Sequence, residues 1–182
     1  MTAGNWFVMG VDLGSTTAKA TVVDQDGALR GASVVQMGAV SRDAVVRAME
    51  QALSEADVDY ENIRRIVSTG YGRKLVPGAA RSFTEITCHA RGAAALHPGV
   101  RLVIDIGGRS TELILGQRLE ASVTESYRVG SVAWSMKYFR NGQLTAGAFE
   151  RAEIAAKAIL DEALALYPRH AWDVAYGSSG TV

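Results

Sequence analysis

The residues best suited to chemistry lie in one short segment, residues 103–115, where apolar sequence is interrupted by an acid, two glycines and hydroxyl residues. A carboxylate at the end of a buried strand is costly unless a partner or a metal ion compensates its desolvation. Glycines let backbone N–H groups approach a bound anion closely, and neighbouring hydroxyls add donors. The segment therefore predicts a strand, a tight turn and a second strand, with a turn suited to phosphate and a metal ion. Its candidate residues are Asp105, Gly107, Gly108, Ser110, Thr111 and Glu112.

The same order of residues occurs near the N-terminus, in residues 8–24, where apolar sequence again leads to an acid, a glycine and hydroxyls. Either copy alone is also compatible with an ordinary hairpin and a polar turn, but the repeat favours a pair of phosphate-binding turns. Because the copies lie about half a chain apart, we interpret them as a duplicated domain with halves at 1–99 and 100–182. The residues of this copy are Asp12, Gly14, Ser15, Thr16, Thr17 and Lys19.

Composition argues against several other classes of protein. The 182 residues contain 19 Lys and Arg and 19 Asp and Glu, so the net charge gives no support for binding nucleic acid or an anionic membrane. No apolar run is long enough to span a membrane, and no signal-peptide pattern is present. Cys88 is the single cysteine, which excludes an internal disulfide and a multi-cysteine metal site within one chain. We therefore expect a cytoplasmic protein.

Hydrophobic periodicity predicts an α/β fold. Ser41 is the expected N-cap of the first helix. The strand at 63–67 follows a helical crossover and should therefore run parallel to the first strand. Strands are expected at 6–11, 19–24, 28–36, 63–67, 103–106, 111–115, 119–128 and 172–176, and helices at 42–56, 84–96, 130–139 and 145–166.

A basic loop broken by glycines, residues 68–74, adds candidate cations. It follows a strand, and ligands in open α/β sheets collect beyond the carboxyl ends of strands. Arg73 or Lys74 could then reach a phosphate, and a solvated basic loop is an equally good explanation.

The helix at 84–96 contains an acid, a cysteine and a histidine. Glu85 lies in its first turn and could simply complement the helix dipole. Cys88 and His89 are neighbours on a helix and point to different faces, so they would not easily bind one metal ion. We interpret both as structural residues.

The C-terminal sequence resembles a third phosphate-binding loop, because glycines and hydroxyls follow a predicted strand. A flexible Gly-Ser tail is the alternative. A helix should follow such a loop, so we expect the second half to be incomplete, through truncation or because a partner supplies the rest. The exposed sheet edge of an incomplete half would favour a homodimer. The loop residues are Gly177, Ser178, Ser179, Gly180 and Thr181.

The paired turns resemble those of the actin, sugar-kinase and Hsp70 ATPase superfamily, in which two ribonuclease-H-like domains bind a phosphorylated ligand. The first half resembles the ATPase activators of 2-hydroxyacyl-CoA dehydratases and benzoyl-CoA reductases (BadF/BadG/BcrA/BcrD type). The matching segments are 11–20, 68–73, 84–93 and 103–108. The second half instead resembles the exopolyphosphatase and guanosine pentaphosphate phosphohydrolase (Ppx/GppA) family. The matching residues there are 105–113, 126, 130–132 and 177–181.

The resemblance implies a duplicated actin-type ATPase fold that hydrolyses phosphoanhydride bonds of polyphosphate, guanosine pentaphosphate or ATP. Asp12 and Asp105 would hold Mg²⁺, directly or through water, which requires them to face each other across a groove. The family's water-positioning glutamate matches Glu85, and Glu112 is a second candidate for that role. The family's basic loop residue matches Arg73. The expected partner is a phosphorylated small molecule, with ATP as a candidate cofactor.

Two departures from the family patterns keep other functions open. The phosphohydrolase hairpin usually has three consecutive glycines, and Arg109 stands at the third position here. The activators usually carry a cysteine after the second hairpin that holds a bridging iron–sulfur cluster, and no cysteine follows Cys88. We therefore expect no iron–sulfur cluster. An ATPase activator and a non-catalytic module remain the alternatives, whether the chain is a natural relative or a chimera joined near residue 100.

Overall fold

The computed structural model describes residues 6–179, and the chain divides into two compact units, Met1–Glu85 and Ile86–Val182. The division falls at the first residue of helix α2 (Glu85–Leu96). The domain limits expected from the sequence, 1–99 and 100–182, stay a prediction. Each unit contains a sheet and helices, so the α/β class is confirmed.

The first unit contains, within its described residues, a five-stranded sheet in the order β3-β2-β1-β4-β5. Strands β1 to β3 are antiparallel neighbours, and β4 lies parallel to β1, as the helical crossover predicted. Strand β5 is not expected from the sequence, because it is a short edge strand of small and polar residues. The elements are β1 (Phe7–Leu13), β2 (Thr17–Asp24), β3 (Leu29–Gln36), α1 (Arg42–Ala56), η1 (Tyr60–Asn62), β4 (Ile63–Thr69), η2 (Arg73–Leu75) and β5 (Ala79–Ser82).

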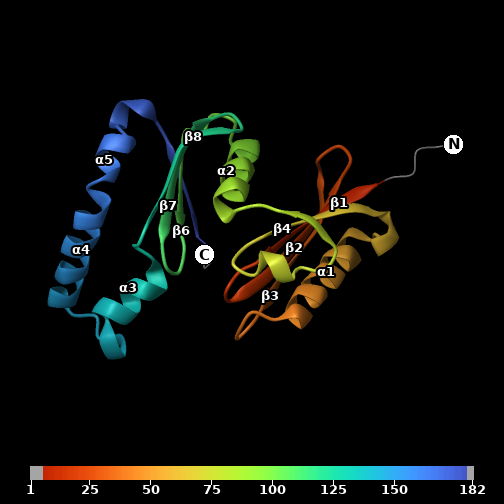
Figure 1. The fold of residues 1–182 in the computed structure, drawn as a ribbon, viewed down its shortest axis with the longest axis horizontal. Helices are drawn as coiled ribbons and strands as arrows, with labels where there is room; N and C mark the ends of the chain where they lie inside the picture. Colours follow the sequence, from red (N-terminus) through yellow and green to blue (C-terminus); the bar gives the residue numbers. More distant parts are fainter. Residues whose placement is uncertain (1–5, 180–182) are drawn as a thin grey trace. The chain divides into compact units, whose positions relative to one another are not determined.

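Helix α1 covers one face of this sheet and closes the core of the first unit (Figure 1). Its N-cap is Ser41, as predicted, and the Ser41 hydroxyl accepts a hydrogen bond from the Ala44 N–H. The helix contacts β3 so closely that a Cβ on Gly31 would lie 2.4 Å from the Ala52 carbonyl oxygen. The buried residues of α1 recur at helical spacing and face the sheet. They are Ala44, Val45, Ala48, Met49 and Ala52.

The second unit contains, within residues 86–179, a four-stranded sheet in the order β8-β7-β6-β9. Strands β6, β7 and β8 form an antiparallel meander, and β9 lies parallel to β6. The elements are α2 (Glu85–Leu96), β6 (Leu102–Ile106), β7 (Thr111–Gln117), β8 (Glu120–Tyr127), α3 (Ser131–Tyr138), η3 (Arg140–Gly142), α4 (Ala146–Leu160), α5 (Ala163–Leu166), η4 (Arg169–Ala171) and β9 (Ala175–Ser179).

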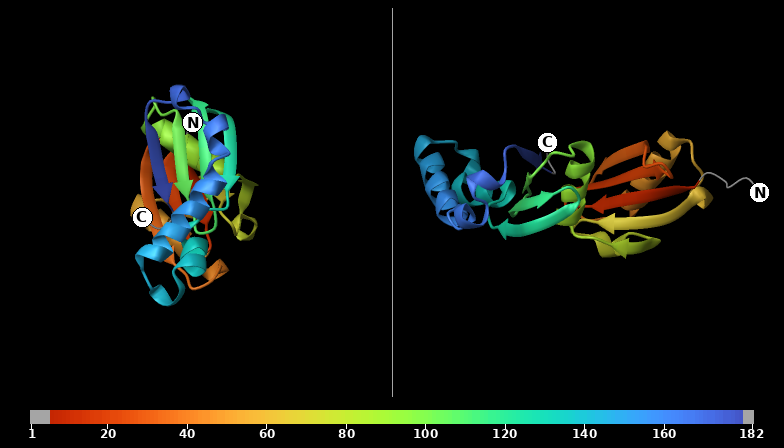
Figure 2. Two further views of the ribbon diagram at one scale, coloured as in Figure 1. Left: turned by 90° about the vertical axis from the view of Figure 1, so that its left-hand side faces the viewer. Right: turned by 90° about the horizontal axis from the view of Figure 1, so that it is seen from above.

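Helices cover both faces of this second sheet, with α2 on one face and α4 and α5 on the other (Figures 1 and 2). Alternation along β6 explains the arrangement, because neighbouring strand residues point to opposite faces. Val103 packs in the cluster that includes Ala94 of α2. Leu102 packs in the cluster that includes Ala163 and Tyr167.

Tyr127 and Tyr167 belong to the same cluster as Leu102 and Ala163, but only one of the two hydroxyl groups is hydrogen-bonded to another described residue. The Tyr167 hydroxyl donates a 2.8 Å hydrogen bond to the Leu113 carbonyl of β7. Burial, helped by nearby Tyr127 and Glu125, raises the pKa of Tyr167 to about 12. The Tyr127 hydroxyl is buried and has no hydrogen-bond partner among the described residues, and burial also raises the pKa of Tyr127.

Two sequence predictions in this unit are wrong in detail. The helix expected at 145–166 is divided into α4 and α5, and at the junction the Leu164 N–H donates to the backbone carbonyl of Asp161, an i+3 bond of the 3₁₀ type. The strand expected at 172–176 lies at Ala175–Ser179 instead.

The shift of that strand also corrects the predicted third phosphate loop. Gly177, Ser178 and Ser179 are part of β9 and pair with Ile104, Asp105 and Ile106 of β6. The Gly-Ser composition suggested a turn, but pairing with a buried parallel strand decides the local conformation. Gly180 and Thr181 lie outside the described residues.

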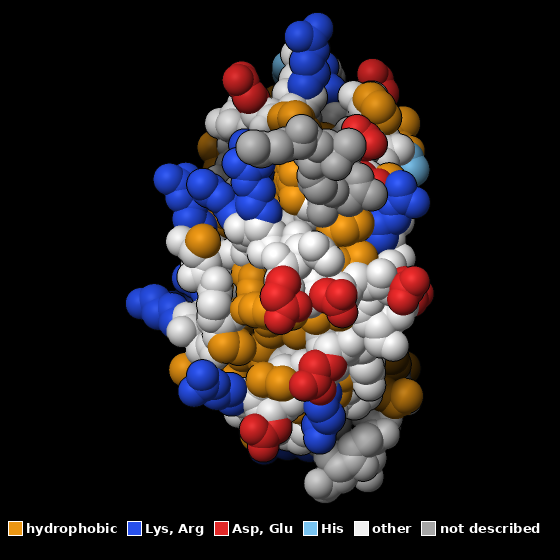
Figure 3. Space-filling model, turned by 90° about the vertical axis from the view of Figure 1, so that its right-hand side faces the viewer, with side chains coloured by type: hydrophobic (Ala, Val, Ile, Leu, Met, Phe, Trp, Pro, Cys, Tyr) orange, Lys and Arg blue, Asp and Glu red, His pale blue; other side chains and the backbone are white. Residues whose placement is uncertain are grey.

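The surface carries charges of both signs. On the face shown in Figure 3, acidic and basic side chains occur together with apolar side chains exposed between them, in keeping with the zero net charge. Among the described residues, every helix is too short or too polar to cross a lipid bilayer.

Candidate functional site

The first candidate turn joins β1 to β2 and brings a cation against its acid. Asp12 and Lys19 are directly opposite each other in the antiparallel pair. The Lys19 ammonium donates to Asp12 Oδ2 at 3.0 Å, and both side chains are partly exposed. The Gly14 N–H donates to the Thr17 carbonyl and closes the turn. The N–H of Ser15, at the exposed tip, donates to no acceptor in the described part of the chain, as an anion-binding turn requires.

The second oxygen of Asp12 has no hydrogen-bond partner among the described residues, although it is buried. Glycine at position 70 makes this burial possible, because a Cβ there would lie 2.5 Å from Asp12 Oδ1. The hydroxyl of Thr69, opposite Asp12 on the parallel strand β4, is likewise buried without a partner in the described residues. Unsatisfied buried polar atoms are rare in folded proteins and mark sites that need an explanation.

The basic loop predicted from the sequence lies beside this acid. Arg73 opens the short helix η2, and its Nη1 donates to the Gly70 carbonyl at 3.1 Å. The Gly72 N–H donates to the Leu13 carbonyl at 2.8 Å, which ties the loop to the end of β1. The loop that carries Arg73 is therefore held against the end of β1, with Gly70 beside Asp12, whereas the side chain of Lys74 is exposed.

The second candidate turn joins β6 to β7 and brings two acids together. Asp105 is directly opposite Glu112 in the antiparallel pair, so the side chains share one face of the sheet. Glu112 Oε1 accepts hydrogen bonds from the hydroxyls of Ser110, at 2.6 Å, and Ser126, at 2.7 Å. Glu112 Oε2 accepts no hydrogen bond from the described residues and lies beside the Gly107 backbone.

The buried acid of this turn has partners from two other elements. The His89 Nδ1 of α2 lies 2.7 Å from Asp105 Oδ2, and the Ser178 hydroxyl of β9 donates to Asp105 Oδ1 at 3.0 Å. The side chain of Asp105 is 8% exposed, so these contacts replace most of its hydration. The interpretation of His89 as a merely structural residue misses this contact. The sequence did indicate that a buried carboxylate at Asp105 needs a partner. It did not indicate where in the chain that partner lies.

Helix α3 packs against the glycine turn through backbone contacts. The N–H groups of Ser131 and Ala133 donate to the carbonyls of Gly107 and Gly108. The fit is tight, because a Cβ on Gly130 would lie 2.2 Å from the Arg109 carbonyl carbon. These bonds use the carbonyl groups of the turn, and the Gly108 N–H donates to no acceptor within residues 6–179.

The remaining predicted site residues are distributed over both units. Glu85 is exposed at the start of α2. Thr111 is buried, and its hydroxyl donates to the Val129 carbonyl rather than into the turn. Thr16 lies at the exposed turn tip, with its carbonyl bonded to the Met37 N–H. Thr17 is buried at the start of β2.

Comparison with known proteins gives the family. Residues 9–121 match the model of the BadF/BadG/BcrA/BcrD ATPase family, and residues 84–182 match that of the Ppx/GppA phosphatase family. The chain belongs to both families. These matches confirm both resemblances inferred from the sequence, and the fold is that of the actin-like ATPase superfamily. The two matched ranges overlap at residues 84–121, which include the Asp105 hairpin.

Individual relatives of both families match different lengths of the chain. A guanosine-5'-triphosphate,3'-diphosphate pyrophosphatase of Vibrio cholerae is 49% identical over 84 residues, 46% of this chain and 17% of that protein. An activator of lactoyl-CoA dehydratase from Anaerotignum propionicum is 31% identical over 159 residues, 86% of this chain and 56% of that protein. The chain thus spans well under two thirds of the length of either relative.

Solved structures of both families share the fold. Component A of (R)-2-hydroxyglutaryl-CoA dehydratase from Acidaminococcus fermentans superimposes with a TM-score of 0.69 at 20% identity, over 97% of this chain and 83% of that chain. A PPX-GPPA enzyme of Aquifex aeolicus superimposes with a TM-score of 0.69 at 17% identity, over 98% of this chain and 69% of that chain.

The family context implies a magnesium ion, and the donor chemistry of the second turn fits one. No cluster of three or more His, Cys, Asp or Glu side chains suited to a metal occurs in the described residues. Magnesium, however, commonly uses one or two carboxylates and takes its other ligands from water and substrate phosphates. Glu112 Oε2, without a hydrogen bond from the described residues and beside Asp105, offers such a carboxylate donor.

Proposed function

We propose that this chain binds a phosphorylated small molecule at its Asp–Gly–hydroxyl turns and hydrolyses a phosphoanhydride bond with the help of Mg²⁺. The proposal rests on one observation. Asp105 of β6 and Glu112 of β7 lie directly opposite each other beside the Gly107–Gly108 turn. Two acids on opposing positions repel each other unless a cation lies between or near them. Membership of the Ppx/GppA phosphatase family supports the same conclusion. Polyphosphate, guanosine pentaphosphate and ATP are the candidate substrates.

In this proposal, Glu85 orients or deprotonates the attacking water if Glu112 Oε2 holds Mg²⁺, and Glu112 has that role if the ion is held by Asp105 and water instead. Two serine hydroxyls hold one oxygen of Glu112, which fixes the carboxylate and leaves the other oxygen for ligand or water. Bound Mg²⁺ would neutralise charge on the phosphate oxygens. Most of the rate gain in phosphoryl transfer comes from positioning and electrostatics, which a rigid hairpin supplies.

In the first unit, Lys19 and Arg73 supply positive charge for phosphate oxygens beside Asp12. The exposed tip of the turn adds the Ser15 N–H. A phosphate bound there would share Lys19 with Asp12, because one ammonium group has three donors and can serve both oxygens.

The test is phosphate release from polyphosphate, guanosine pentaphosphate and ATP in the presence of Mg²⁺. The Asp105→Asn variant should lose roughly a hundredfold or more in turnover, the usual effect of removing one preorganised electrostatic group. Glu112→Gln should show a loss of similar size. Glu125→Gln is the matched control, because it removes one negative charge from an exposed position on β8, next to β7.

Wild-type turnover in Asp105→Asn, with circular dichroism and unfolding unchanged, would refute the assignment. Absence of phosphate release from all three substrates, together with absence of binding heat for ATP and polyphosphate, would favour the non-catalytic module instead.

A second candidate function is that of an ATPase that activates a dehydratase-type enzyme. The match to the lactoyl-CoA dehydratase activator over 86% of this chain favours it. Such a role would require a cysteine-bound cluster shared between two copies of the chain, with Cys88 as the single thiol each copy offers. Anaerobic purification followed by iron analysis and an absorbance scan distinguishes the candidates. A brown, iron-containing protein supports the activator, and a colourless ATPase without iron supports the hydrolase.

A further inference from the structure

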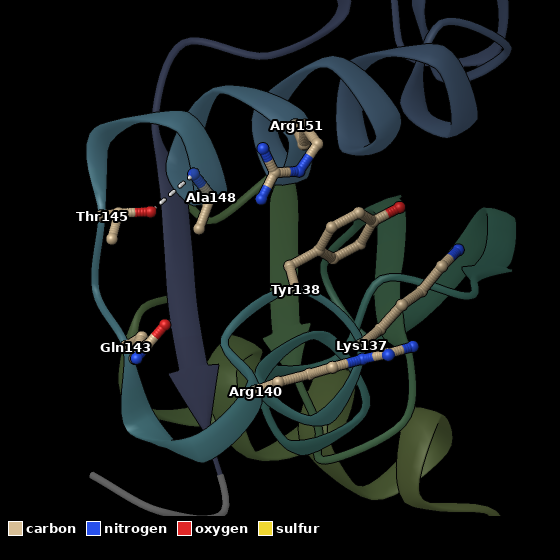
Figure 4. A pocket seen from close by; sticks show the side chains of 7 residues that line it. All are labelled: Lys137, Tyr138, Arg140, Gln143, Thr145, Ala148 and Arg151. Carbon is tan, nitrogen blue, oxygen red and sulfur yellow. Dashed lines mark hydrogen bonds between the residues drawn. The ribbon is translucent and has the colours of Figure 1, made fainter.

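A surface cavity in the second unit gathers three cationic side chains away from the Asp105 hairpin. The cavity has a volume of about 340 Å³, at the lower end of the range for small-ligand pockets. It lies between the end of α3, the η3 turn and the start of α4 (Figure 4). Its lining residues are Lys137, Tyr138, Arg140, Gln143, Thr145, Ala148 and Arg151.

The charges of this cavity are not balanced by protein groups. Among the described residues, no carboxylate lies within 4.0 Å of the cationic groups of Lys137, Arg140 or Arg151. The lining contains no acid at all, whereas Tyr138, Gln143 and Thr145 add polar groups that can donate hydrogen bonds.

The start of α4 adds to the positive potential. The helix has 15 residues with Thr145 as its N-cap, and no acidic residue lies in its first turn. Arg151 folds back over this turn, because a Cβ on Gly147 would lie 3.4 Å from Arg151 Nη1. A cation near a helix N-terminus is electrostatically unfavourable, since the helix dipole is positive at that end. Such an arrangement becomes favourable when an anion occupies the cavity.

Local structure explains only one of the three cations. Lys137 lies in the last turn of α3, where a positive charge stabilises the helix, and its ammonium lies over the rings of Trp134 and Tyr138. The side chains of Arg140 and Arg151 lie over no aromatic ring and make no hydrogen bond or ion pair among the described residues. Arginine is the side chain best suited to paired hydrogen bonds with phosphate oxygens.

We propose that this cavity is a second anion site that binds a condensed phosphate, meaning a chain of at least two phosphoryl groups. Three cationic groups match the charge of such a chain better than that of a single phosphate. The site is independent of the hydrolytic site proposed above, because none of its residues belongs to either Asp–Gly turn. Inorganic tripolyphosphate and the triphosphate of a nucleotide share this chemistry.

The experiment is a titration of the whole chain with sodium tripolyphosphate in buffer containing EDTA, so that no metal ion recruits phosphate to the Asp105–Glu112 turn. Calorimetry gives the affinity, and amide chemical shifts give the location. The expected shifts centre on Gly142 and residues 145–148. Parallel titrations use inorganic phosphate, which should bind much more weakly, and ATP, whose affinity relative to tripolyphosphate identifies the source of the triphosphate.

The Arg140→Gln/Arg151→Gln double variant should weaken tripolyphosphate binding roughly tenfold or more, since it removes two charge-assisted hydrogen-bond donors. The matched control is Arg118→Gln/Lys157→Gln, which removes two exposed positive charges outside the cavity. Asp105→Asn should bind tripolyphosphate as tightly as the wild type, even if it abolishes hydrolysis. Unchanged affinity in the cavity variant, equal weakening in the control variant, equal affinity for inorganic phosphate, or shifts centred on Gly107–Gly108 would each overturn the proposal.

Discussion

The two Asp–Gly hairpins share a backbone plan but compensate their acids differently. In the first hairpin, the residue opposite Asp12 is Lys19, whose ammonium contacts the carboxylate directly. In the second hairpin, the residue opposite Asp105 is Glu112, a second acid, and the compensating cation or donor is His89 on a helix. Equivalent positions on similar turns therefore carry opposite charges.

This difference shows how a duplicated hairpin can serve two ligand chemistries. A turn with its own cation attracts phosphate oxygens, whereas a turn with two opposed acids attracts a divalent cation. The two turns differ at this position of the second strand, yet each is closed by a backbone hydrogen bond from its glycine, Gly14 to the Thr17 carbonyl and Gly107 to the Ser110 carbonyl. We expect the first turn to favour phosphate and the second to favour the metal ion, and the following predictions test the packing and charge that distinguish them.

The largest effect is expected for Gly70→Ala, which disrupts the packing around Asp12. A Cβ at this position would lie 2.3 Å from the Leu13 carbonyl oxygen, and the φ angle of Gly70 is +94°. We expect a loss of roughly 3 kcal/mol in the free energy of unfolding, from left-handed backbone strain and overpacking together. Urea unfolding measures the loss, and hydrogen exchange should localise it to β1 and β2.

Gly27→Ala is the matched control for Gly70→Ala. Gly27 has a φ of +84° but nothing within 4 Å of the added Cβ, so only the backbone strain of about 1 kcal/mol should appear. Losses of equal size in both variants would show that close packing at Gly70 does not support the first turn.

The next largest effect is expected for His89→Ala, which removes a partner from the buried acid of the second turn. Loss of a hydrogen bond to a buried charged group costs about 2 kcal/mol. Lys19→Met, the counterpart in the first turn, should cost only about 0.5 kcal/mol, because that ion pair is partly exposed and solvent screens it. Urea unfolding of both variants checks the ranking. A larger loss in Lys19→Met would reverse our view of which acid depends more on its partner.

A smaller effect is expected where Tyr167 anchors β7, the strand that carries Glu112. Tyr167→Phe leaves the Leu113 carbonyl without this donor and should cost about 1 kcal/mol. Tyr127→Phe is the control from the same cluster. It removes a buried hydroxyl without a partner in the described residues, so it should leave stability unchanged or raise it. Thermal or urea unfolding that shows equal losses would contradict the assigned hydrogen bond.

The contribution of Tyr167 to the free energy of unfolding should also depend on pH. Its pKa is raised to about 12, so the folded state holds the phenol proton more tightly than the unfolded state does. The stabilisation is therefore complete below the ordinary tyrosine pKa of about 10 and is lost as pH rises through about 12. In Tyr167→Phe, this part of the alkaline loss of stability should disappear.

Sequence reasoning identified both turns because each is a local pattern of an acid, glycine and hydroxyl residues between apolar strands. The strand at 63–67 and the cap at Ser41 were predictable for the same reason, since period and capping are properties of neighbouring residues. The partners of the acids were not predictable. His89 of α2 and Ser178 of β9 contact Asp105. These two elements lie far apart in the sequence and approach each other only when the chain folds.

The errors near the C-terminus have the same cause. The Gly-Ser composition of residues 177–179 is typical of a loop, but these residues complete β9 because β6 supplies a partner for their backbone. The cationic cavity could not be predicted from the sequence either. Lys137, Arg140 and Arg151 are not adjacent in the chain, and no motif links them.

The sequence by itself determined the α/β class, the repeated hairpin and the acids at its turns, because strand periodicity and glycine placement act over a few residues. Only the tertiary structure decided which side chains compensate those acids, which buried oxygens have no partner among residues 6–179, and where unbalanced positive charge gathers. Those properties depend on distances between segments far apart in the chain, and burial sets their energies once the sheets and helices have packed.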